Sequence, residues 1–409
     1  MRLHIPPSLK HRRFRLYWLG LTISIAGTQM QTWALFWHIR TLTDQPIALG
    51  GIGMARILPV LLFSLVGGAL ADRLNRRKII FVTQMMMALG AFGLAALSYS
   101  GSIALWHIYA LTAVQATALV FDTPSRQALV PNLVPERDLA NAFSLTQAGF
   151  QVGAIVGPAI GGFVIAFWGL SFTYLINAFS YMAVILALIM MGQVTQEKIF
   201  NARALVNLPE IVEGLRFVLA QPIIVSTMVL DFFATFFSSA NTLMPIVARD
   251  ILGVGPVEYG WLSSAQAIGA VIAAVAISQL RSIPRQGRVL LGAVVVFGLA
   301  TICFGAARTL GIAMLALILV GGADAVSTIV RNTARQLQTP DFLRGRMTSV
   351  NQVFFMRGPQ LGEVEAGLLA QLAGAPFAIV SGGVGCLLAV FWVSRRWPQL
   401  HRYQGEQVP

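Results

Sequence analysis

The chain has 409 residues, of which 56% are apolar and only 11% are charged. This composition excludes an ordinary soluble protein, in which about 25% of residues are charged. The formal net charge of +13 would suit a polynucleotide partner, but the positions of the basic residues, described below, exclude that function.

Apolar stretches of about 20 residues, the length that a helix needs to cross the hydrocarbon core, recur along the chain. A membrane-spanning β-barrel would need alternating strands instead of continuous apolar runs. The sequence therefore predicts an all-α membrane protein with twelve transmembrane helices. They are expected near residues 16–38, 49–71, 79–99, 103–122, 141–167, 172–192, 222–246, 258–280, 289–307, 311–331, 347–371 and 376–394.

The basic residues indicate how these helices are oriented. The segment before the first stretch is basic, but the apolar run that follows is too long for a signal peptide and has no small-residue cleavage site. With this end placed inside, the outer loops hold only Arg40, Arg249 and Arg308 of the 29 Lys and Arg residues. This asymmetry predicts cytoplasmic termini and contact of the inner loops with anionic lipid, with no nucleic-acid partner.

A charged hinge, GGALADRLNRRK at residues 67–78, separates the second and third stretches. Asn75 within it is compatible with a left-handed turn, because asparagine tolerates that backbone best after glycine. Farther on, Asp122 and Arg126 lie four residues apart at the inner end of the fourth stretch, where we expect a structural ion pair.

The fifth stretch contains the run GAIVGPAIGG. Glycines at a spacing of four let two helices approach closely, and a proline bends a helix by removing a backbone hydrogen bond. The run is therefore either a hinge or a generic packing seam. Its key residues are Gly153, Gly157, Pro158, Gly161 and Gly162.

The chain contains an internal repeat. A shift of 209 residues superimposes Arg126 and Gln127 on Arg335 and Gln336, and Arg76 on Arg285. An offset of about half the chain predicts two parallel six-helix repeats, the arrangement of two-bundle transporters with a central binding site. We expect an N-terminal bundle at 1–192, a linker at 193–221 with an amphipathic helix from Leu208 to Val218 at the inner surface, and a C-terminal bundle at 222–409.

Acidic residues inside the predicted spans are costly and usually functional. Asp231 lies near the middle of the seventh span, with Thr235 and Ser238 on the same face. We favour cavity lining over a buried structural pair for Asp231. For Asp324 in the tenth span the two alternatives are equal, and Arg331 is close enough in sequence to pair with it.

The eleventh span contains Glu363, Glu365 and Arg357. Residues two apart on a helix point about 200° apart, so the two carboxylates cannot face one cavity. One is expected to face the pathway as a proton-coupling group and the other to pair with a neighbouring helix. The alternative is an internal ion-pair cluster that only fixes helix packing.

The first span places Gln29, Thr32 and Trp33 at its middle, where they either form a substrate surface or satisfy neighbouring helices. Thr235 and Ser238 are further substrate-surface candidates. Cys303 and Cys386 fall inside spans and support neither a disulfide nor a metal site. No P-loop, GxSxG or HExxH motif occurs, so we expect neither an enzyme nor a cofactor.

Four features together resemble one branch of the major facilitator superfamily, which includes the enterobactin exporter and macrolide efflux proteins. They are the 67–78 loop, GPAIGG, the Arg-Gln loops, and LGEVEAG with the GRM start at Gly345. The resemblance implies that GxxxGPxxGG is an antiporter motif and that Asp72 lies near the cytoplasmic end of the eleventh helix. It also implies a conformational gate formed by Gly68, Asp72, Arg73, Arg76 and Arg77.

The implied function is export of an amphipathic small molecule, a drug or a siderophore-like compound, across the bacterial inner membrane by a monomer. The implied coupling is proton antiport. One departure is that no arginine lies between Leu105 and Phe121, where proton antiporters often carry one. A proton-coupled nutrient symporter and a non-transporting sensor or scaffold remain the alternatives.

Overall fold

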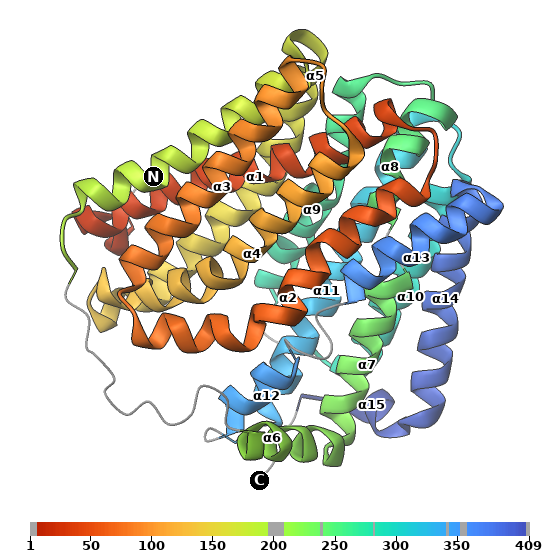
Figure 1. The fold of residues 1–409 in the computed structure, drawn as a ribbon. Coiled ribbons are helices and arrows are strands. Elements are labelled where there is room, and N and C mark those ends of the chain that lie inside the picture. The colour runs from red at the N-terminus through yellow and green to blue at the C-terminus, as the bar shows by residue number, and fades with distance from the viewer. Residues whose placement is uncertain are drawn as a thin grey trace. The chain divides into compact units, whose positions relative to one another are not determined.

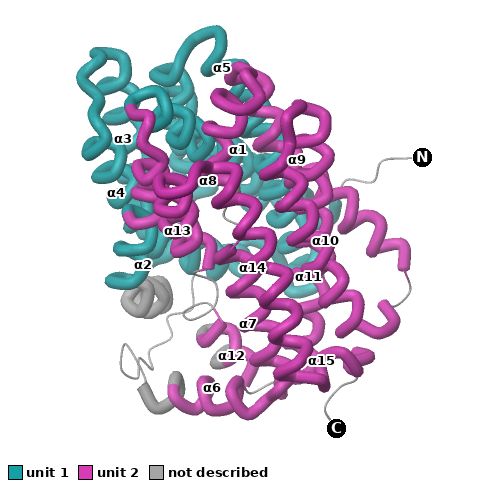
Figure 2. Tube along the Cα trace, turned by 90° about the vertical axis from the view of Figure 1, so that its right-hand side faces the viewer, with its two compact units in different colours: residues 1–42, 55–206 teal, residues 43–54, 207–409 magenta. Residues whose placement is uncertain are grey.

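The computed structural model describes residues 6–194, 208–237, 240–280, 283–340, 343–351 and 358–405. The side chains at 64–73, 208–211, 240, 345–346 and 349 lie outside this description. Every regular element in the described residues is a helix, which confirms the predicted all-α fold (Figure 1). The chain forms two compact units: unit 1 is 1–42 with 55–206, and unit 2 is 43–54 with 207–409 (Figure 2).

Unit 1 consists mainly of long helices that correspond to the first six predicted spans. The longest, α5, is interrupted at Gly169, where a φ of 83° turns the chain between the fifth and sixth spans. Only glycine adopts this backbone without strain. The helices are α1 (Arg12–Leu42), α2 (Ile47–Arg73), α3 (Arg76–Tyr99), α4 (Leu105–Leu129) and α5 (Leu139–Met190), with short turns η1 (Pro7–Lys10), η2 (Val130–Asn132) and η3 (Glu136–Asp138).

Unit 2 holds the remaining spans and the first turns of α2. The seventh predicted span is occupied by α7 and α8, and the eleventh by α12 and α13. The elements are α6 (Leu208–Ala220), α7 (Pro222–Phe237), α8 (Ala240–Ile246), the π-helical turn η4 (Val247–Ile251), α9 (Pro256–Ser278), α10 (Gln286–Ala306), α11 (Leu310–Leu337), α12 (Arg344–Val350), α13 (Gly358–Ala373), α14 (Ala375–Arg396) and α15 (Pro398–Arg402).

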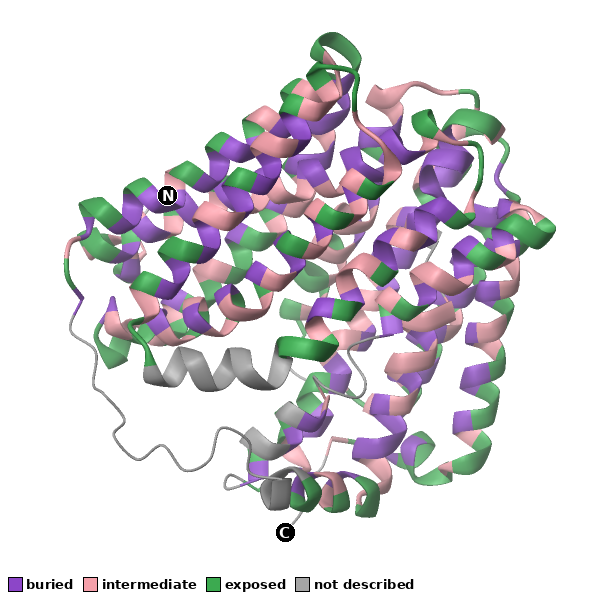
Figure 3. Ribbon diagram, in the orientation of Figure 1, coloured by how far each residue is buried: buried purple, intermediate pink, exposed green. Residues whose placement is uncertain are grey.

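The surface composition is that of a membrane protein. Seven helices in the described part of the chain are long and apolar enough to cross a membrane. Large apolar side chains such as Leu89, Phe167 and Leu388 are exposed. Exposed residues recur along many of the helices (Figure 3). A soluble protein rarely exposes contiguous apolar surface on this scale, whereas lipid covers it in a membrane.

Glycines set the closest helix contacts. Gly269 on α9 and Gly321 on α11 face each other's helices, and a Cβ atom at either position would overlap a backbone carbonyl oxygen of the other helix, Ile318 or Gln266. Association of helices in lipid depends on such close packing, because burial of apolar surface gives no extra gain there.

A helix, α6, occupies the later part of the predicted linker. Its apolar residues Leu215, Phe217 and Val218 pack against α7 and α12, where the buried partners include Met228 and Met347. These three residues of α6 are therefore packed against protein within unit 2.

A buried network of amide side chains joins four helical segments of unit 1. Gln31 on α1 donates to Gln115 on α4 (2.7 Å) and accepts from Asn177 on α5 (2.7 Å). Gln115 in turn donates to the Met87 carbonyl on α3 (3.2 Å), and Ser180 donates to Asn177 (2.8 Å). Each amide side chain forms a hydrogen bond with another amide, so these polar groups can be buried without water.

Replacement of Gln31 by leucine should lower the free energy of unfolding by about 2–4 kcal/mol, because it leaves a donor of Asn177 and an acceptor of Gln115 buried without partners. Thermal unfolding of the purified protein measures this loss. Gln371→Leu, on an exposed site of α13, is the matched control and should change stability by less than about 0.5 kcal/mol. Equal midpoints for the two variants would show that the network contributes nothing.

Candidate functional site

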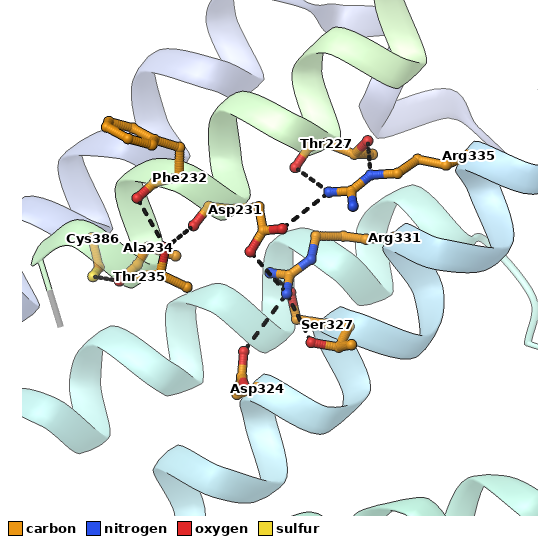
Figure 4. A network of polar contacts seen from close by, with 11 residues as sticks. Thr227, Asp231, Phe232, Ala234, Thr235, Asp324, Ser327, Arg331, Arg335 and Cys386 are labelled. Carbon is orange, nitrogen blue, oxygen red and sulfur yellow. Dashed lines mark hydrogen bonds and ion pairs between the residues drawn. The ribbon is translucent and has the colours of Figure 1, made fainter. Parts of the chain in front are cut away.

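An ionic network lies inside unit 2, between α7 and α11 (Figure 4). The Asp231 carboxylate lies between two guanidinium groups, 3.0 Å from Arg331 and 3.1 Å from Arg335. The Asp231 side chain is 14% exposed and each arginine side chain 5% exposed. Burial of this kind is tolerated only because each charge has an opposite partner and further hydrogen bonds.

The helical spacing of α11 explains how the two arginines reach one carboxylate. Arg331 and Arg335 are four residues apart and therefore lie on one face of the helix. Arg331 also donates to the hydroxyls of Ser327 (2.9 Å) and Thr328 (2.8 Å), and Arg335 donates to Thr227 on α7 (3.4 Å). These contacts hold both guanidinium groups against α7.

Arg335 was not among the predicted site residues. The repeat places it opposite Arg126, which the sequence assigned to a structural pair with Asp122. The repeat contains the signal that identifies Arg335. The position equivalent to Asp122 in the second half of the chain is Arg331, so the second half has two arginines where the first half has an acid and an arginine. Two arginines on one buried helix face require an acid from another helix, and Asp231 supplies it.

Asp324 differs from Asp231 in its surroundings. It lies 3.7 Å from Arg331, and its side chain is 49% exposed. It lines a cavity of about 280 Å³ that is formed entirely by unit 2. Thr235 lines the same cavity, where its hydroxyl donates to the Asp231 carbonyl (2.8 Å). Other polar side chains of the lining are Asn241, Thr242, Gln266 and Glu363.

The structure separates the two glutamates of α13. Glu363 lines the cavity, and the first turns of α2 pack beside it, because Gly53 has no side chain to collide with its Cβ atom. Glu365 is half-buried and is not part of the cavity lining. The predicted positions of Arg357 and Ser238 lie outside the described residues.

The GPAIGG segment packs α5 against α1 within unit 1. A Cβ atom at Gly153 would lie 2.6 Å from the Ile25 side chain and 3.0 Å from the Ala26 nitrogen. The same atom at Gly161 would lie 2.7 Å from Met30. Pro158 and Gly162 are buried in the same helix. The glycines thus permit backbone-to-backbone contact along two turns of each helix.

Among the first-span candidates, only Gln29 lines the cavity in unit 1, which has a volume of about 300 Å³. Thr32 and Trp33 are half-buried and are absent from that lining. The Asp122–Arg126 pair expected from the spacing is present and lines this cavity.

Two arginines of the 67–78 loop hold helix ends together in unit 1. Arg76 donates to the Ala128 carbonyl (3.2 Å) in the last turn of α4, and Arg77 donates to the Leu188 carbonyl (2.9 Å) in the last turn of α5. Carbonyls at helix C-termini carry partial negative charge, which suits a guanidinium. The side chains of Asp72 and Arg73, and the surroundings of Gly68, lie outside the description.

No left-handed turn occurs at Asn75. Its φ of −65° and ψ of 108° are extended, and its side chain caps α3 by accepting from the Lys78 nitrogen. N-cap preference, rather than tolerance of a positive φ, explains asparagine here. No group of three His, Cys, Asp or Glu side chains suited to a metal ion occurs in the described residues.

The long apolar helices, with a buried ionic network between two of them, are typical of a multi-pass membrane protein. The profile of the Transmembrane secretion effector family (MFS_3) matches residues 6–404, and the chain belongs to this family of the major facilitator superfamily.

Curated relatives and solved structures agree with this assignment. The multidrug efflux pump Tap of Mycolicibacterium fortuitum is 28% identical over 354 residues, 84% of each chain. The enterobactin exporter EntS of Shigella boydii is 26% identical over 378 residues, 92% of this chain and 90% of that one.

Among solved structures, an inward-facing bacterial homolog of the human lysosomal transporter Spinster has a TM-score of 0.74 at 15% identity, covering 97% of this chain and 99% of that one. A POT family transporter has a TM-score of 0.72 at 13% identity, with 98% of both chains covered. Family, fold and relatives together support a membrane efflux transporter that binds a small molecule and is not an enzyme.

Proposed function

We propose that this protein exports an amphipathic small molecule, a drug or a siderophore-like compound, from the cytoplasm across the bacterial inner membrane in exchange for protons. It works as a monomer with both termini in the cytoplasm. The bundles at 1–192 and 222–409 alternate between inward-open and outward-open states, and the linker at 193–221 joins them. The names of the relatives, a multidrug efflux pump and an enterobactin exporter, support the direction.

The observation that carries proton coupling is the difference between the two aspartates of unit 2. The carboxylate of Asp231 lies between two guanidinium groups, at 3.0 and 3.1 Å. Asp324 has one more distant partner and faces the cavity. A carboxylate that reaches the cavity can accept and release a proton there, while Asp231 keeps both arginines neutralised in either state. Glu363, on the same lining, is the second candidate for the proton, and Glu365 and Arg357 are assigned to packing of the eleventh span.

The gate and the substrate surface complete the proposal. Asp72, at the cytoplasmic end of the second span, contacts the eleventh helix in one state and loses that contact in the other, which is the way packed helices switch between discrete arrangements. Gly68, Arg73, Arg76 and Arg77 support this gate, and the 153–162 segment is the hinge beside it. Substrate contacts are assigned to Gln29, Thr32, Trp33, Thr235 and Ser238.

Asp324→Asn should reduce proton-driven transport at least tenfold, because an amide cannot carry the coupled proton. The assay uses everted membrane vesicles across which a pH gradient is imposed. It measures the uptake of a macrolide, a catecholate siderophore and a cationic dye. Asp324→Glu should keep transport, and Glu136→Gln, which removes an exposed carboxylate from unit 1, should leave it unchanged. Normal flux through Asp324→Asn at both neutral and acidic pH contradicts the assignment.

The same vesicles separate the alternatives. An exporter accumulates substrate in everted vesicles, whereas a nutrient symporter accumulates it only in right-side-out ones. A sensor or scaffold shows no saturable flux in either orientation.

A further inference from the structure

Two arginines related by the repeat have different surroundings in the two units. Arg335 in unit 2 is 5% exposed and is bound on two sides, by Asp231 and by Thr227. Arg126, at the equivalent position in unit 1, has a side chain that is 17% exposed and lines the unit 1 cavity. The residue at the repeat position of Asp231 is Thr22, whose hydroxyl donates to the carbonyl of its own helix at Trp18. In unit 2 the carboxylate of Asp231, on another helix, pairs with Arg335. Unit 1 has no carboxylate at the equivalent position to pair with Arg126.

The partner of Arg126 is saturated by other donors. Asp122 is 1% exposed, and its Oδ1 atom accepts from Thr83 (2.8 Å) and Gln84 (3.1 Å) on α3. Its Oδ2 atom pairs with Nε of Arg126. The two terminal nitrogens of Arg126 bond to no other described residue. Asp122 and Arg126 both line the cavity, but the carboxylate oxygens already accept from Thr83, Gln84 and Arg126, whereas the terminal guanidinium nitrogens have no described protein partner.

A second donor belongs to a residue of the same cavity lining. Tyr17 on α1 is completely buried and lines the cavity, and its hydroxyl has no hydrogen-bond partner among the described residues. A buried hydroxyl without a partner is costly, so its presence indicates a group that is bound there when the site is filled. The hydroxyl and the two terminal guanidinium nitrogens thus provide free donors and no free carboxylate.

The rest of the lining is amphipathic. Gln29, Thr146 and Gln147 are polar, whereas Leu21, Phe143 and Phe150 are apolar and aromatic. The volume of about 300 Å³ is at the lower limit for small-molecule sites and fits one acidic group with an attached ring. The apolar wall disfavours a small hydrated inorganic ion, and an organic cation is disfavoured because both oxygens of Asp122 are already engaged by Thr83, Gln84 and Arg126.

We infer that this cavity binds the acidic group of an amphipathic organic anion, a carboxylate, sulfonate or ionised phenol, through Arg126 and Tyr17. The planar guanidinium binds such a group with two parallel hydrogen bonds, and the apolar body of the ligand lies against Phe143 and Phe150. This inference rests on the proposed export function and assigns the charge of its substrate.

Calorimetric titration of the full-length protein in phosphatidylcholine nanodiscs tests the charge preference. The probes are naphthalenesulfonate, its neutral sulfonamide and naphthylmethylammonium, which share one ring system. The anion should bind saturably, and the other two at least about tenfold more weakly, because hydrogen bonds to a charged group are about twice as strong as neutral ones. Equal affinity for the three probes overturns the inference. Loss of anion binding when phosphatidylglycerol is added identifies a lipid site and overturns it as well.

Variants locate the binding. Tyr17→Phe removes a hydroxyl that has no protein partner, so the thermal midpoint should not fall, while the affinity for naphthalenesulfonate falls about tenfold. Arg126→Lys keeps the charge opposite Asp122 but loses the planar donor pair. It should therefore lower the affinity for naphthalenesulfonate by a similar factor. Arg137→Gln, which removes an exposed charge from the same unit, is the matched control. Unchanged affinity in both Tyr17→Phe and Arg126→Lys overturns the inference.

The vesicle assay keeps the two proposals apart. Export of the macrolide, siderophore or dye without any binding of naphthalenesulfonate leaves the export function standing and overturns the anion site. Binding of naphthalenesulfonate with the expected variant pattern, but without flux of any compound, leaves the anion site standing and overturns export.

Discussion

Asp231→Asn is expected to lower the free energy of unfolding by about 3–5 kcal/mol, the cost of leaving a buried charge without its partner. Both arginines lose their short ion pair at once. Arg331 then keeps a carboxylate only at 3.7 Å, that of Asp324, and Arg335 keeps Thr227 at 3.4 Å among the described residues. Thermal unfolding of the purified protein in detergent measures the effect, and transport should fall with the amount of folded protein.

The control for this substitution is Asp324→Asn. It removes the same charge from the same network, but at a half-exposed side chain with a longer contact, so it should cost less than about 1 kcal/mol. A double-mutant cycle of Asp231→Asn with Arg335→Gln should recover part of the loss, because the second change removes the unpaired guanidinium. If Asp231→Asn unfolds at the same temperature as Asp324→Asn, the bridging role assigned to Asp231 is wrong.

Gly157→Ala is expected to have the second large effect. The added Cβ atom would overlap the Ala26 carbonyl oxygen on α1 and lie 2.9 Å from the Gln29 Cβ atom. A backbone oxygen cannot move aside as a side chain can, so α1 and α5 must separate along the segment. Overpacking of this kind costs about 1–3 kcal/mol, and transport should fall about tenfold because the geometry of the proposed hinge is lost.

Gly311→Ala on α11 provides the matched control, since a Cβ atom there meets nothing within 4 Å. Alanine is the better helix former, so this variant should be stabilised by up to about 1 kcal/mol. The measurements are the thermal midpoint and the flux into everted vesicles. Equal flux through both variants would mean that the glycines of the fifth span serve only helix packing and have no role as a hinge.

The spans and local pairs could be predicted because their determinants lie close together in sequence. The length of the continuous apolar runs indicates the helices, and the four-residue spacing of Asp122 and Arg126 predicts their pair. Asp231 and Arg335 are 104 residues apart, and their contact depends on how α7 packs against α11. Spacing along the chain carries no information about that packing.

The glutamates of α13 show the same limit. The helical period predicts that Glu363 and Glu365 point in different directions, but it does not tell which of the two faces a cavity. That choice depends on α7 to α11, which supply the rest of the lining, and on Gly53, which lets α2 approach the Glu363 side. In the first span, likewise, Gln29 lines a cavity while Gln31 two residues later is used by the amide network.

The division of α2 between the two units bears on the order in which the chain can fold. Gly50 and Gly53 pack on α13 in unit 2, and a Cβ atom at Gly50 would lie 3.4 Å from the Cα atom of Gly367. Gly367 leaves the ribosome 317 residues after Gly50, a delay of roughly 15–60 s at ordinary rates of synthesis. The glycine face of α2 therefore remains uncovered by its final partner during most of translation, and the last steps of assembly take place after ten of the twelve spans have been made.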